Sequence, residues 1–246
     1  MFTTMKFTSL EALRNQLATL PHEDYPAIKI LFVPDHKSTD DNQLLSLYSG
    51  LNGFRYDTVV FLETNIKITD KKIPMATFSE FQSEFGPIQI NDQLRNDFCD
   101  EDDDFFIDDH AAGPDMEVYN HLPYLKAAIE EFKLVSVQVC DEDPSIVREV
   151  AYVLSEIMDG RSALLVVACS FPGDHYGIND IKNLLDSGDQ SNIMNLLNSG
   201  DYKVSGSAAF QSGVFVGYNW GVTFHFLHST SANSSALAGY GVQGAI

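Results

Sequence analysis

The chain has 246 residues, and its 35 acidic and 15 basic residues give a formal net charge of −20 at pH 7. Such a charge repels phosphate groups, so we expect neither nucleic acid nor an anionic membrane as a partner. The sequence also lacks an apolar run of about 18 residues, a signal-peptide pattern and a disulfide pattern, and we expect a single cytoplasmic domain over residues 1–246.

The first predicted elements are a helix and a strand–helix–strand unit. A capping box at residues 8–11 and leucines at helical spacing predict a helix that ends at Pro21. Apolar runs at 27–33 and 57–63 predict two strands, with a helix at 42–51 between them. This order is typical of a βαβ unit, whose strands are parallel.

The rest of the chain continues to alternate between strands and helices. Residues 66–90 mix charged and apolar positions and predict a short antiparallel excursion. Further helices are expected at 124–132, 145–158, 180–185, 192–197 and 214–218, and further strands at 134–139, 163–170, 222–227 and 239–246. The pattern favours a single-domain α/β/α sandwich with a mixed, mainly parallel central sheet.

Polar side chains follow three of the predicted strands, and these are the candidate site residues. In open α/β sheets, ligands bind just beyond the carboxyl ends of the strands, which predicts one shared pocket. The candidates are Asp35, His36, Thr64, Asn65, Asp174 and His175. Two histidines and one carboxylate can hold divalent iron. The alternative is that these are ordinary turn residues that satisfy backbone donors.

The remaining sequence patterns give weaker evidence about function. The acidic run 100–104 resembles the start of a calcium loop, but Phe105 and Ala111 occupy the positions that need Gly and Glu, so we expect a solvated loop. His225 and His228 are three residues apart on a predicted strand and point to opposite faces. Neither a glycine-rich phosphate loop nor a serine-hydrolase elbow is present.

Short segments along nearly the whole chain carry a family resemblance. Residues 34–38 read Pro-Asp-His-Lys-Ser, residues 122–125 read Leu-Pro-Tyr-Leu, and residues 170–177 read Ser-Phe-Pro-Gly-Asp-His-Tyr-Gly. They resemble Pro-His-Ala-Gly-Tyr, Leu-Pro-Phe/Tyr-Leu and Ser-Ser-Asp-x-x-His-x-Gly of the MEMO-like family, also called AmmeMemoRadiSam system protein B. The resemblance implies a fold similar to that of class III extradiol dioxygenases.

The departures from the family pattern bear on its metal site. The family histidine after the first strand falls on Asp35, with His36 one place late. The histidine after the second strand falls on Asn65 or Ile66, and only His175 matches cleanly. The resemblance therefore implies a degenerate metal pocket that binds no metal, or a weakly held divalent iron or copper through His175 with Asp35 or His36.

Two functions follow from this resemblance. The preferred one is a binding or accessory protein for an unknown small molecule or protein partner, without dioxygenase activity. The alternative is a metal-dependent oxidoreductase of extradiol-dioxygenase-like type. In it His175, His36 and Asp35 would be the ligands, and Asp174 would accept a proton.

Overall fold

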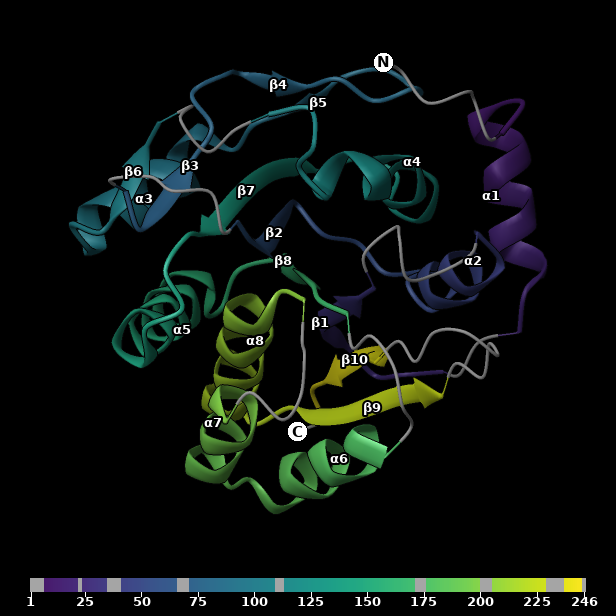
Figure 1. Cartoon of the computed structure of the whole chain (residues 1–246). Helices are drawn as coiled ribbons and strands as arrows, with labels where there is room; N and C mark the ends of the chain where they lie inside the picture. The colour runs from purple at the N-terminus through teal and green to yellow at the C-terminus, as the bar shows by residue number, and fades with distance from the viewer. Residues whose placement is uncertain are drawn as a thin grey trace.

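A mixed β-sheet forms the centre of the protein (Figure 1). The computed structural model describes residues 7–21, 24–34, 41–65, 71–108, 113–170, 176–199, 205–228 and 237–244. In these residues, eight strands pair in the order β6-β3-β7-β2-β8-β1-β10-β9, and β4 pairs with β5 separately. The strands are β1 (Ile28–Val33), β2 (Thr58–Thr64), β3 (Ile73–Met75), β4 (Glu80–Phe81), β5 (Ile88–Gln89), β6 (Phe105–Ile107), β7 (Lys133–Val139), β8 (Ala163–Ala168), β9 (Thr223–His228) and β10 (Leu237–Val242).

The middle of the sheet is parallel and its margins are mixed. Strand β2 pairs in parallel with both β7 and β8, and β8 pairs in parallel with β1. Strand β10 is antiparallel to β1 and to β9, while β3 is antiparallel to β7. The predicted mainly parallel sheet is confirmed. The two strands of the predicted βαβ unit are parallel, but β8 lies between them.

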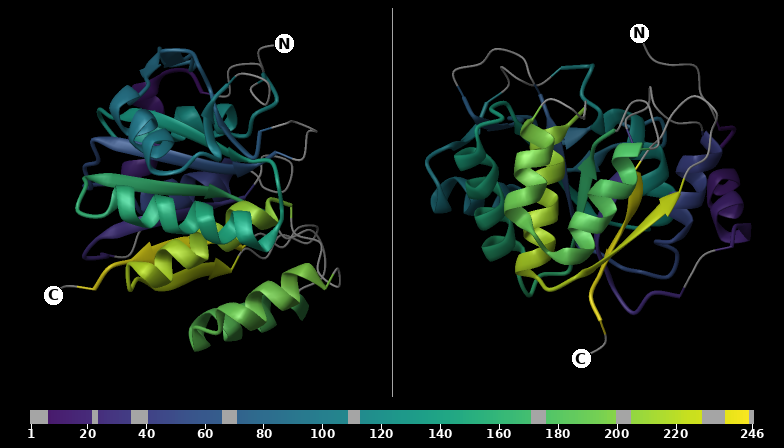
Figure 2. Two further views of the ribbon diagram at one scale, coloured as in Figure 1. Left: turned by 90° about the vertical axis from the view of Figure 1, so that its left-hand side faces the viewer. Right: turned by 60° about the horizontal axis from the view of Figure 1, so that its bottom comes forward.

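Helices cover both faces of the sheet. Helices α1 (Leu10–Thr19), α2 (Asp41–Ser49) and α4 (Val118–Ala128) pack on one face (Figure 1). Helices α3 (Asp92–Glu101), α5 (Pro144–Met158) and α8 (Ser207–Asn219) pack on the other. Helices α6 (Tyr176–Ser187) and α7 (Gln190–Asn198) lie outside α8 (Figure 2). Because both faces of the sheet are covered, β8 is apolar and buried along its whole length.

Several boundaries differ from the predicted ones. Ser9, one residue after the predicted cap, accepts a hydrogen bond from the Ala12 N–H and begins α1. Helix α8 begins at Ser207, well before the predicted 214–218, because it is buried nearly all round and so shows no helical period. The antiparallel pairing of β4 with β5 and of β3 with β7 confirms the excursion at 66–90.

The prediction of a solvated loop at residues 100–104 is wrong in part. Asp100 and Glu101 end α3, and the turn that follows leads into β6, which pairs with β3. Asp102 and Asp104 are half-buried beneath α5. Tertiary packing of Phe105 against Phe98 holds this segment in place despite its charge.

Within the described residues, no helix is long and apolar enough to cross a membrane.

Candidate functional site

The carboxyl ends of β1, β8 and β2 lie at one edge of the sheet. Val33 pairs with Ala168, and Leu62 pairs with Val167, so the three parallel strands end side by side. The backbone N–H of Cys169 donates to the Val33 carbonyl over 2.9 Å and extends this alignment past the strand ends. The segments that follow the three strands therefore start from the same edge, as the sequence predicts.

Four of the six predicted site residues lie outside the described residues. These are Asp35, His36, Asp174 and His175. The metal-ligand set assigned to them stays a prediction. The two predicted pocket residues on β2, Thr64 and Asn65, are described.

Thr64 and Asn65 fasten the tip of β2 to its neighbours. Thr64 Oγ1 accepts a hydrogen bond of 3.0 Å from the Ala209 N–H in the first turn of α8. Helix α8 has Gly206 at its N-cap and no side-chain cap of its own, so Thr64 serves as an acceptor for it. Asn65 Nδ2 donates to Gln138 Oε1 over 2.7 Å, and the Asn65 N–H donates to the Val139 carbonyl. Both residues thus form hydrogen bonds that hold neighbouring elements together at the edge where the pocket was predicted.

Glu63, the residue before Thr64, points to the opposite face of the sheet and is buried. Its Oε2 accepts a hydrogen bond of 2.6 Å from the backbone N–H of Glu117, at the start of α4. Burial raises the pKa of Glu63 to about 8, and the nearby Glu117 and Asp115 carboxylates act in the same direction. A pKa of about 8 favours the neutral carboxylic acid at pH 7, although hydrogen bonds from the Glu117 and Val118 N–H groups lower it.

A fully buried histidine lies one helical turn further along α4. His121 Nδ1 is 3.0 Å from Tyr48 Oη, and its Nε2 is 3.6 Å from Glu117 Oε1. Its ring packs against Phe61, with ring centroids 5.5 Å apart. Burial raises the pKa of Tyr48 well above its usual value, so this hydroxyl keeps its proton. The pair forms a hydrogen-bonded unit inside the protein.

Sequence reasoning missed Glu63, Glu117 and His121. Two features of the sequence could have drawn attention to Glu63 and His121. Glu63 is a charged residue that continues an otherwise apolar strand, and His121 stands directly before the Leu-Pro-Tyr-Leu segment. Neither signal identifies the partner residue, because the partners lie far away in the sequence.

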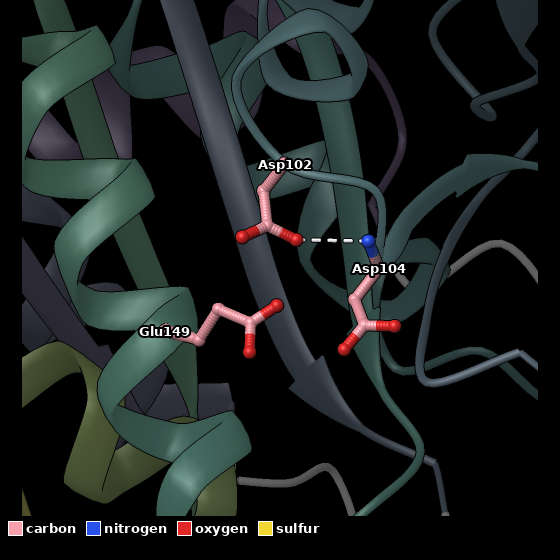
Figure 3. Close-up of side chains that lie close together, drawn as sticks. All are labelled: Asp102, Asp104 and Glu149. Carbon is pink, nitrogen blue, oxygen red and sulfur yellow. Dashed lines mark hydrogen bonds between the residues drawn. The ribbon is translucent and has the colours of Figure 1, made fainter.

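A separate acidic cluster lies beneath α5. Figure 3 shows Glu149 of α5 pointing toward Asp102 and Asp104, with one carboxylate oxygen of each within 4.8 Å of the others. Asp102 Oδ1 also accepts a hydrogen bond of 2.8 Å from the Asp104 N–H. Burial and the two aspartates raise the pKa of Glu149 to about 7. Among the described residues, this is the group of three acidic, histidine or cysteine side chains arranged to hold a metal ion.

The charges in this cluster are already partly balanced. Lys72 Nζ lies 2.7 Å from Asp104 Oδ2, and both side chains are partly exposed. Carboxylate oxygens suit hard cations such as Ca²⁺ or Mg²⁺ rather than divalent iron or copper. The cluster could thus hold a hard cation, and the backbone carbonyl of its Lys72 accepts the Cys140 N–H just past the carboxyl end of β7, the strand beside β2.

The fold and the comparisons together identify the class and the family. The eight-stranded mixed sheet with helices on both faces is the extradiol dioxygenase-like fold. Residues 10–218 match the model of the Memo-like protein family, and the chain belongs to this family. It is also similar to the crystal structure of an uncharacterized protein, JW3007, from Escherichia coli K12, with a TM-score of 0.60 and 12% identity over 88% of this chain and 100% of that one. No curated protein matches the chain.

Proposed function

We propose that this Memo-like protein is a binding or accessory protein with a degenerate metal pocket, and that it does not act as a dioxygenase. The observation that carries the proposal is the bonding at the tip of β2. Asn65 is one of the two positions, with Ile66, on which the histidine implied by the family resemblance falls, and it bonds to Gln138 of β7, while Thr64 before it bonds to α8. We propose the carboxyl edge of β1, β8 and β2 as the binding surface for a small molecule or a protein partner.

The donor set at this strand tip does not fit a catalytic iron. Such a centre requires three ligands held firmly by the protein around them. Thr64 Oγ1 accepts the Ala209 N–H, the Asn65 amide donates to Gln138, and the Glu63 carboxyl is turned under α4. A metal would then depend on His175, the one residue that matches the family pattern cleanly, together with Asp35 or His36, which favours weak and incomplete occupancy.

The alternative function is a metal-dependent oxidoreductase, and one observation favours it. Strands β1 and β8 are direct neighbours, with Val33 paired to Ala168. The segments that contain Asp35, His36, Asp174 and His175 therefore follow adjacent strand ends. This arrangement supports a site in which both histidines and Asp35 hold iron or copper and Asp174 accepts a proton.

Elemental analysis of full-length protein, purified without chelator, separates the two functions. We expect far less than one equivalent of metal, both as purified and after incubation with iron(II) or copper(II) followed by dialysis. His175→Ala is the test variant. His225→Ala is the control, because His225 is exposed on β9. One equivalent of iron together with oxygen uptake, both lost in His175→Ala and kept in the control, would refute the proposal.

A further inference from the structure

Three buried polar atoms without a hydrogen-bond partner lie under α4. Among the described residues, Glu63 Oε1, His121 Nε2 and Ser136 Oγ lack partners, as do Arg95 Nε and Gln211 Oε1 elsewhere. Buried polar groups without partners are rare in folded proteins, and each needs an explanation such as an ordered water or ion.

The strand register places the Glu63 and Ser136 side chains on one face of the sheet. In the parallel β2–β7 pair, Phe61 stands opposite Ser136 and Glu63 stands opposite Gln138. Side chains two residues apart on a strand share a face, so all four point the same way. That face is covered by α4, because Phe61 contacts the His121 ring.

The first turn of α4 lies directly over Glu63. The Glu117 N–H donates to Glu63 Oε2 and the Val118 N–H also bonds to this carboxyl, so two backbone donors hold it beneath the start of the helix. One turn later, His121 lies against Phe61, the residue two before Glu63. Glu63, Ser136 and His121 therefore all face the layer between the β2–β7 pair and the first two turns of α4.

One bound polar molecule would supply the missing hydrogen-bond partner of all three atoms. A buried water is stable where it finds two to four polar partners. A neutral Glu63 offers an O–H donor, and the Ser136 hydroxyl can donate or accept. His121 Nε2 is a donor or an acceptor according to the tautomer that Tyr48 selects through Nδ1. Each of the three groups can therefore bond to a water molecule.

We propose that Glu63, Ser136 and His121 enclose an internal site that binds an ordered water molecule through hydrogen bonds. A metal ion fits this site less well than a water molecule does. Among the described residues, the acidic, histidine and cysteine ligand atoms close enough to share a metal are those of the Asp102 cluster alone. A neutral guest also matches a carboxyl that burial keeps protonated.

The site lies directly behind the tip of β2. Glu63 precedes Thr64, and Asn65 bonds to Gln138, which stands opposite Glu63 in the sheet. The inference rests on the α4 face of the sheet alone and holds whether or not the protein binds a metal.

Infrared spectroscopy of the full-length protein at pH 6 tests the proposal. We expect a carbonyl band from a protonated, hydrogen-bonded carboxyl, assigned to Glu63 by its loss in Glu63→Gln. Ser136→Ala should move this band toward that of a carboxyl with fewer hydrogen bonds and should lower the melting temperature. Ser212→Ala is the matched control, since Ser212 is a buried serine whose hydroxyl donates to the Val147 carbonyl on the other side of the sheet. It should leave the band in place.

Three results would contradict the proposed water site. An unbonded Ser136 hydroxyl would carry the free-energy cost of a buried polar group without a partner. Ser136→Ala would then remove that cost, raise the melting temperature and leave the Glu63 carbonyl band unchanged. Absence of a protonated carboxyl band in the wild type, as a bound cation would cause, also overturns it. A second readout needs no variant: NMR cross-relaxation between water and the Ser136 amide should report a long-lived water. Absence of that signal would refute the proposal.

Discussion

The Glu63 carboxyl and the Glu117 backbone N–H, 54 residues apart in the sequence, join the tip of β2 to the start of α4 across 2.6 Å. Glu117, the N-cap of α4, makes no capping bond with its own side chain, so Glu63 supplies an acceptor that the helix lacks. The position of a sheet edge and the start of a helix thereby depend on one buried carboxyl. We therefore expect the protonation of that carboxyl to affect the stability of the protein.

Stability should fall as the pH rises through the range in which Glu63 differs between the folded and unfolded chains. The folded pKa of about 8 lies above the ordinary value of 4.5. Between these values the folded chain keeps the proton that the unfolded chain has lost, so the free energy of unfolding decreases by up to about 1.4 kcal/mol per pH unit. Below pH 4.5 and above pH 8, Glu63 adds no pH dependence.

Glu63→Gln isolates this contribution. The amide oxygen can accept the Glu117 N–H and the amide NH₂ can replace the carboxyl O–H, but the side chain does not titrate. Urea unfolding at several pH values from 4 to 9 should show the variant gaining stability relative to the wild type as the pH rises. Parallel curves for the two proteins would show that Glu63 has an ordinary pKa.

Thr64→Val should destabilise the protein by about 1–2 kcal/mol. Valine keeps the shape of the side chain but removes the oxygen that accepts the Ala209 N–H in the first turn of α8, and losing a cap costs this much. Thr223→Val, at an exposed position of β9, is the control and should change stability little. Equal unfolding free energies for the two variants would mean that Thr64 does not hold α8.

Tyr48→Phe should cost about 1–3 kcal/mol with little change in packing. The substitution leaves His121 Nδ1 without its partner in a fully buried position, and an unsatisfied buried group carries this penalty. Tyr152→Phe is the matched control, because Tyr152 is exposed on α5. Chemical denaturation compares the two. A loss no larger than that of the control would show that the Tyr48–His121 bond contributes nothing to stability.

The sheet was the more predictable part of the structure, and particular residues show why. Strands β1, β2 and β8 are largely buried on both faces, so the sequence carries mainly apolar runs, interrupted by Lys29 in β1 and Glu63 in β2, that end within a residue or two of the real strands. Helix α8 was predicted at only its last part, because burial of residues 208–217 on all sides removes the helical period from the sequence.

The bonding at the candidate site could not be predicted locally. Glu63 reads as the polar end of a strand, and its burial depends on Glu117 at the start of α4. His121 and Tyr48 are 73 residues apart and meet only because α2 and α4 pack on the same face. The strand tips at β1, β8 and β2 were predictable, since parallel strands place their carboxyl ends at one edge.

Glu149→Gln should raise the melting temperature at low salt. Glu149 lies among the Asp102 and Asp104 carboxylates, and their repulsion together with burial raises its pKa to about 7. Removing its charge relieves that repulsion at pH 8, where Glu149 is mostly ionised. Glu156→Gln is the control, because Glu156 is exposed on the same helix. The gain should shrink in 0.5 M salt, since screening weakens interactions between partly exposed charges. A gain equal to that of the control, or one independent of salt, would show that the three carboxylates do not repel one another in solution.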